Sequence, residues 1–149
     1  MTKFLLAVHV LAAIVAIGPV TVAASMFPPA ARRALAAPDD TRAAETVQLL
    51  HRICKVYAVA GVVVPVFGFA TASTMGVLGS AWLIVSIALT VLAALVLAAL
   101  VLPAQTALVE GDGTREKTVR LAMFTGVFNL LWAAVTILMI VRPGSTTGA

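Results

Sequence analysis

Charged residues and cysteine are both scarce in this 149-residue sequence. Asp, Glu, Lys and Arg make up 11% of the chain, whereas they form about a quarter of a typical soluble domain. Cys54 is the only cysteine, so an intrachain disulfide and a cysteine-based metal cluster are both excluded. The net charge of +4 comes from basic residues beside apolar runs, where they set topology and contact lipid headgroups. We therefore expect no nucleic-acid partner.

Sequence motifs of enzymes are also missing. The chain contains no HExxH pair, no glycine-rich phosphate loop and no Ser, His and Asp set that could converge. No acidic residue lies within a long apolar run, which argues against a transporter or pump with a proton relay. These absences favour a protein that is not an enzyme.

Apolar residues, in contrast, make up 62% of the chain, and its mean hydropathy is +1.10. They gather in four runs, at about 3–27, 55–73, 80–103 and 119–141. About 20 helical residues cross the hydrocarbon core of a bilayer, so each run is long enough to do so. The sequence predicts an all-α, four-helix transmembrane bundle that forms one integral membrane domain over residues 1–149.

Prolines and capping residues mark the expected helix ends. We expect the first helix to end at Pro28 and Pro29 and the third span to end at Pro103, because proline cannot continue the hydrogen-bond ladder. Asp39, Asp40 and Thr41 can supply the cap of a second helix that begins near Thr41. Pro65 predicts a kink inside that second helix.

The basic residues predict the orientation. Five Lys or Arg residues lie in or beside the first polar linker and three in or beside the second, against Lys3 and Arg142 near the termini. The positive-inside rule therefore places both linkers in the cytoplasm and both termini outside, in a multi-pass protein of the bacterial plasma membrane. The two linkers also resemble each other, which leaves open two tandem helical hairpins or simple convergence.

Histidine, serine and threonine inside the spans are the candidate chemical groups. His9 lies within the first span, and Ser86 and Thr136 fall near the same depth, close to Pro65. His9, Ser86 and Thr136 are candidate cofactor-binding residues, and the only metal we consider is a haem iron at His9. The alternatives for His9 are a hydrogen bond that joins two helices and a side chain that faces lipid.

A second group of polar residues lies at the cytoplasmic end of helix two. We expect His51, Arg52 and Lys55 to contact lipid headgroups. His51 would be on the order of 20 Å from His9 along the membrane normal, so the two cannot share one metal. Asn129, near the bilayer centre, should pair with a neighbouring helix.

Small residues four apart allow helices to approach closely, within a bundle or between chains. Three such pairs occur in the spans: Ala12 and Ala16, Gly68 and Ala72, and Ala94 and Ala98.

Several short motifs resemble an uncharacterised family of four-span bacterial membrane proteins, DUF2269. These are AVHVLAA around His9, the Trp82-Leu83 pair before a span that ends in Leu-Pro, and MIVRPG at residues 139–144. The chain is more distantly similar to HemJ-type protoporphyrinogen oxidases, a resemblance that implies haem ligation by His9. That family has a lysine four residues after a tryptophan in span three, but here Ser86 follows Trp82 at that spacing. The departure argues against oxidase activity.

Two functional hypotheses follow. The first is a non-enzymatic accessory or interaction subunit that contacts the lipid bilayer and forms a homo-oligomer or joins a larger membrane complex. The second is a haem b-binding or other cofactor-binding redox protein that uses His9. A small-solute or lipid carrier is a third alternative, supported only by the proline kinks.

Overall fold

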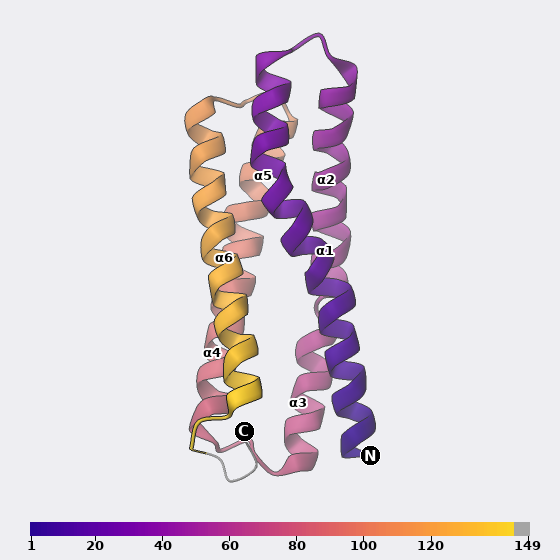
Figure 1. The fold of residues 1–149 in the computed structure, drawn as a ribbon, viewed down its shortest axis with the longest axis vertical. Helices are drawn as coiled ribbons and strands as arrows, with labels where there is room; N and C mark the ends of the chain where they lie inside the picture. The colour runs from indigo at the N-terminus through magenta and orange to yellow at the C-terminus, as the bar shows by residue number, and fades with distance from the viewer. Residues whose placement is uncertain (145–149) are drawn as a thin grey trace.

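The computed structural model describes residues 1–144, and every regular element among them is helical. The elements are α1 (Thr2–Ala36), α2 (Thr41–Ala60), α3 (Val63–Met75), α4 (Ala81–Val96), the π-helix η1 (Leu97–Val101), α5 (Leu102–Val109) and α6 (Arg115–Val141). α3 continues α2, and η1 and α5 continue α4, so the chain forms four long helices, each long and apolar enough to cross a membrane. Figure 1 shows them side by side, with the start of α1 and the end of α6 at one end. The predicted all-α four-helix bundle is confirmed.

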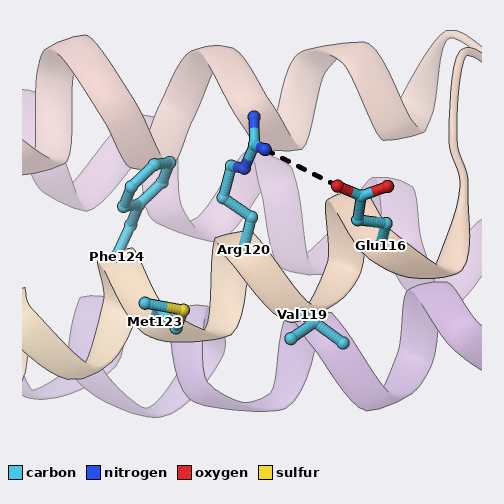
Figure 2. A pocket seen from close by; sticks show the side chains of 5 residues that line it. All are labelled: Glu116, Val119, Arg120, Met123 and Phe124. Carbon is cyan, nitrogen blue, oxygen red and sulfur yellow. Dashed lines mark ion pairs between the residues drawn. The ribbon is translucent and has the colours of Figure 1, made fainter.

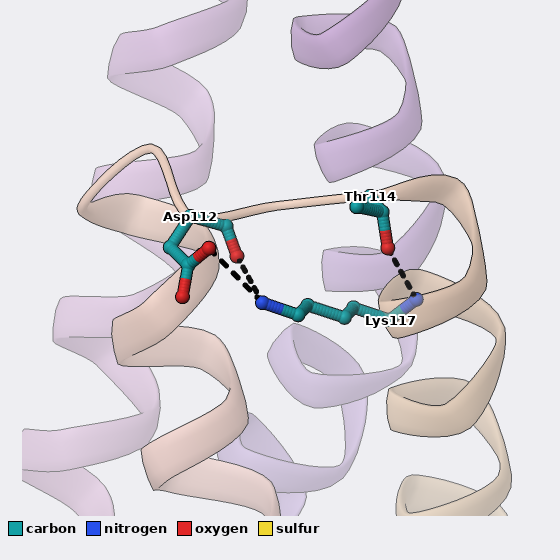
Figure 3. A network of polar contacts seen from close by, with 3 residues as sticks. All are labelled: Asp112, Thr114 and Lys117. Carbon is teal, nitrogen blue, oxygen red and sulfur yellow. Dashed lines mark hydrogen bonds and ion pairs between the residues drawn. The ribbon is translucent and has the colours of Figure 1, made fainter.

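Side-chain caps start two of the four long helices. The Asp40 carboxylate accepts hydrogen bonds from the backbone N–H groups of Arg42 and Ala43, so the predicted start at Thr41 is confirmed. Thr114 caps α6 by accepting from the backbone N–H of Lys117 at 3.3 Å. The Lys117 ammonium reaches back to the Asp112 carboxylate at 3.1 Å and to its carbonyl at 2.9 Å (Figure 3). These contacts fix the short linker before α6.

The expectation that prolines end two helices is wrong. α1 continues through Pro28 and Pro29 to Ala36, and the third long helix continues through Pro103 to Val109. Ahead of Pro103 the helix widens into η1, in which the Leu102 N–H bonds to the Leu97 carbonyl five residues back. A π-turn of this kind absorbs a local misfit without ending the helix. In hydrocarbon an open backbone is costly, so a distorted helix is the cheaper solution.

The kink predicted from Pro65 is confirmed. α2 ends at Ala60 and α3 begins at Val63, so a two-residue turn interrupts the second long helix. Pro65 has no N–H for the Gly61 carbonyl four residues earlier. That carbonyl instead accepts from the Val64 N–H at 3.1 Å, in a tighter turn.

The four helices pack as two hairpins. α1 lies along α2 and α3 in the first hairpin, and α4 lies along α6 in the second, in agreement with tandem hairpins. The hairpins meet through α1 with α6 and α2 with α5. The main core at this junction is apolar and includes fully buried Val20, Phe27, Val101 and Leu121. A smaller cluster of Ala72, Trp82 and Leu83 lies apart from this core, near the turn from α3 to α4.

Candidate functional site

His9 joins α1 to α3. Its Nδ1 lies 2.8 Å from the backbone oxygen of Val64. A carbonyl oxygen only accepts, so His9 carries its proton on Nδ1 and donates it. The ring rests on Gly68, where an added Cβ would lie 2.7 Å from His9 Cε1. Glycine at position 68 is therefore needed for the ring to reach its acceptor.

Ser86 and Thr136 form no hydrogen bond with His9 within residues 1–144. The Ser86 hydroxyl is fully buried and donates to the Trp82 carbonyl at 2.7 Å. The Thr136 hydroxyl donates to the Trp132 carbonyl at 3.0 Å. Each hydroxyl thus bonds to its own helix in the second hairpin, whereas His9 bonds within the first. Among residues 1–144 no hydrogen bond connects the three side chains that depth alone had grouped.

His51 faces the second hairpin, and its expected contact with lipid headgroups stays a prediction. Its side chain is only 8% exposed, and its Nδ1 lies 2.9 Å from Oε1 of Gln105. Nε2 lies 3.3 Å from the Thr106 hydroxyl, and Phe27 meets the ring edge-on. Arg52 and Lys55 are exposed, as a headgroup contact requires. His51 is buried because the helical period places it on the same face of α2 as the buried residues Val47, Leu50 and Cys54.

Gln105 is the polar residue that sequence reasoning missed. It is fully buried, accepts from His51 and donates from Nε2 to Sγ of Cys54 at 3.6 Å. The sequence placed it in a polar linker after Pro103, but it belongs to α5, directly after the π-turn. His51, Gln105 and Cys54 therefore form a buried polar network that ties the two hairpins together. We call these three residues the inter-hairpin network.

An open groove of about 470 Å³ lies beside the inter-hairpin network, between α2 and the η1–α5 segment. Its polar residues are His51, Lys55, Thr106 and Glu110, and its apolar ones are Ala98, Leu102, Pro103 and Ala107. The groove therefore combines charge and hydrocarbon on one surface.

A second groove, of about 500 Å³, runs along α6 alone (Figure 2). It is lined by Glu116, Val119, Arg120, Met123 and Phe124. The Glu116 carboxylate lies 3.7 Å from the Arg120 guanidinium, and both side chains are well exposed. Since these two charges satisfy each other, this groove leaves less unpaired charge for a ligand.

Asn129 pairs across helices as expected. Its Nδ2 donates to the Ser25 hydroxyl of α1 at 3.1 Å. Three nearby polar atoms are buried without a hydrogen-bond partner in the described part of the chain: Thr21 Oγ1, Thr125 Oγ1 and Asn129 Oδ1. The Asn129 bond thus joins α1 to α6 at the edge of their apolar contact.

The small-residue pairs differ in what they contact. Ala16 and Ala72 are buried, and Gly68 lies beneath His9, so these pairs serve packing within the chain. Ala94 and Ala98 are exposed on the second hairpin. Gly126 in α6 is also open, since an added Cβ there would meet no described atom within 4 Å. The sequence shows another pair of small residues here, because Ala122 precedes Gly126 by four residues.

Within residues 1–144, no group of three or more His, Cys, Asp and Glu side chains could hold a metal ion. The fold defines a four-helix, multi-pass membrane protein, in which His9, His51 and Asn129 form hydrogen bonds between helices. No protein-family model matches the chain. No curated protein and no solved structure matches it either. The resemblance to DUF2269 and to HemJ-type oxidases stays a prediction.

Proposed function

We propose that this chain is a non-enzymatic accessory subunit of the bacterial plasma membrane, which binds another transmembrane helix through the open face of α6. The partner helix belongs to a second copy or to a larger membrane complex. Both linkers lie in the cytoplasm and both termini outside, as the distribution of Lys and Arg indicates.

The observation that carries this proposal is the open glycine at position 126. Glycine within a helix is less stable than alanine by roughly 1 kcal/mol. At Gly68 the missing Cβ makes room for His9, but nothing in the described chain uses the space at Gly126. A partner helix that approached Gly126 closely would use that space and gain van der Waals contact, which drives helix association in membranes.

The surroundings of Gly126 suit such a contact. Ala122 lies one turn before it, and Met123, Val127 and Leu130 on the same helix are exposed apolar side chains. Large side chains around a small-residue notch are typical of helix pairs that pack in lipid. Supporting evidence against an enzyme is that the ring nitrogens of His51 and the hydroxyls of Ser86 and Thr136 already face partners within the chain.

The test is co-purification from native membranes solubilised in a mild detergent. The wild-type chain should elute as an oligomer or with another membrane protein, and Gly126→Leu should lose that association while it stays folded. Ala88→Leu is the matched control, because Ala88 is an exposed small residue on α4, away from the α6 face. A wild-type chain that elutes alone as a monomer, or a Gly126→Leu variant that associates normally, would contradict the proposal.

A haem b protein that uses His9 is the second candidate, and the protonation state of His9 favours it. Because Nδ1–H donates to the Val64 carbonyl, the lone pair of the neutral ring lies on Nε2. Metal-bound histidines commonly have this arrangement, in which a backbone carbonyl orients the ring. Nε2 of His9 could therefore hold a haem iron, which would supply redox chemistry. The Ser86 and Thr136 hydroxyls donate to carbonyls of their own helices.

A visible spectrum after haem supplementation decides between the two functions. The haem candidate predicts a Soret band that His9→Ala abolishes and His51→Ala retains. A chain without a Soret band, or a band that survives His9→Ala, would exclude haem binding at His9.

A further inference from the structure

We propose that the groove between α2 and α5 binds a zwitterionic phospholipid with a primary amine, of the phosphatidylethanolamine class. Lys55 would contact the phosphate and Glu110 the ammonium group. This inference is independent of the proposed partner contact on α6 and goes beyond general contact with the bilayer.

Along its length the groove changes from apolar to charged, as a phospholipid does from acyl chain to headgroup. Ala98 lies at one end of its α4–α5 wall and Glu110 at the other, about 18 Å apart at 1.5 Å per helical residue. Ala98, Leu102 and Pro103 give this wall an apolar surface. Glu110 follows α5 directly, beside the second linker, which the expected topology places at the membrane surface. An acyl chain can therefore lie along the apolar end while the headgroup meets the charged end.

Lys55 and Glu110 lie in the same order along the membrane normal as the phosphate and the ammonium of the headgroup. His51 and Thr106 are in contact, which places their positions on α2 and α5 at one level. Lys55 lies one turn deeper in the membrane than His51, and Glu110 one turn nearer the surface than Thr106. Their backbones are thus about 12 Å apart along the axis. The lysine stem can extend toward the surface and shorten this distance. In the lipid, too, the phosphate lies deeper than the ammonium.

Lys55 and Glu110 have no ion-pair partner in the described part of the chain. Lys117 pairs with Asp112 and Arg120 with Glu116, but Lys55 and Glu110 form no ion pair within residues 1–144. Both side chains are exposed and line the same groove. A cation beside an anion complements a zwitterion, whereas an anionic glycerol headgroup would meet repulsion from Glu110. A primary ammonium also donates hydrogen bonds to a carboxylate, which a choline headgroup cannot do.

The experiment measures retained lipid by native mass spectrometry. The full chain is reconstituted into vesicles of equal parts phosphatidylethanolamine, phosphatidylcholine and phosphatidylglycerol with matched acyl chains, and is then released into mild detergent. The wild type should retain phosphatidylethanolamine in preference to the other two. Glu110→Gln should reduce this preference about tenfold, as the loss of one charge-assisted hydrogen bond would do. Lys55→Gln should lower the retention of all three lipids.

Glu116→Gln is the matched control, since Glu116 is an exposed carboxylate near the same membrane surface but lies on the α6 groove. It should leave the lipid preference unchanged. Circular dichroism of each variant checks that the helices are intact. The proposal is overturned if Glu110→Gln keeps the wild-type preference, if Glu116→Gln loses it equally, or if the wild type prefers phosphatidylglycerol.

Discussion

The contact of His9 with Gly68 gives the sharpest stability prediction, through the substitution Gly68→Ala. The new Cβ would lie 2.7 Å from His9 Cε1 and 3.0 Å from Nδ1, so the imidazole must move. Movement lengthens the 2.8 Å hydrogen bond to the Val64 carbonyl. Pro65 already interrupts the helix beside this carbonyl, so few backbone hydrogen bonds remain there when the bond from His9 is lost.

The expected net cost is about 1–3 kcal/mol in the free energy of unfolding. Overpacking costs roughly 1–3 kcal/mol and a lost hydrogen bond in the membrane about 0.6 kcal/mol or more. Alanine is more favourable than glycine within a helix, which offsets this cost by up to about 1 kcal/mol. The measurement is reversible unfolding of the detergent-solubilised protein by increasing SDS, followed by circular dichroism.

The same substitution in a His9→Ala background is the matched control for this experiment. Without the imidazole the new Cβ at position 68 has no ring to displace, so Gly68→Ala should there be neutral or stabilising by up to about 1 kcal/mol. A Gly68→Ala substitution that has the same effect in both backgrounds would refute the contact of His9 with α3.

Three further predictions use the same unfolding assay. Gln105→Ala should cost about 1–3 kcal/mol because it leaves the buried His51 without its acceptor, and an unchanged midpoint would contradict the inter-hairpin network. Asn129→Ala should cost about 0.6 kcal/mol, the mean for an interhelical hydrogen bond in a membrane, and a loss above about 3 kcal/mol would show that Asn129 does more than bond to Ser25. Asp40→Ala should cost about 1 kcal/mol through the lost cap of α2, whereas the exposed Asp39→Ala should be neutral; equal effects would argue against the cap.

The sequence predicted what depends on local chemistry. Apolar length identified the four spans, the capping residues at 39–41 identified the start of α2, and Pro65 identified the break before α3. Each of these follows from a residue acting on its own neighbours along the chain. The cross-helix pairing of Asn129 could also be predicted, because hydrocarbon offers a mid-membrane amide few other partners.

Proline was misread because its effect depends on tertiary packing. Pro28 is buried in α1 with Phe27 and Ala31, so the last turns of this helix stay packed although the prolines leave carbonyls free. The third long helix also continues through Pro103, and its backbone adjusts in the π-turn η1 just ahead of that proline. The extra residue in that π-turn also rotates everything after it, which turns Gln105 inward toward His51. No local pattern announces this rotation, so the inter-hairpin network could not be derived from the sequence.

The orientation of side chains around each helix decides which neighbours the candidate site residues contact. Residue counting placed His9, Ser86 and Thr136 at one depth, but depth does not say which neighbour a side chain faces. For His51 the signal was present, because Val47 and Cys54 mark the same buried stripe at helical spacing. Of the three side chains in that segment, His51 is therefore buried, whereas Arg52 and Lys55 are exposed.

Photo-crosslinking in native membranes tests the proposed partner contact most directly. A photoreactive amino acid replaces Leu130, which is 73% exposed beside Gly126 on α6, or Val59, which is 74% exposed on α2. The proposal predicts a discrete protein adduct from position 130 and none from position 59, and the adduct should disappear in a Gly126→Leu background. Equal adducts from both positions, or adducts to lipid alone at position 130, would contradict it.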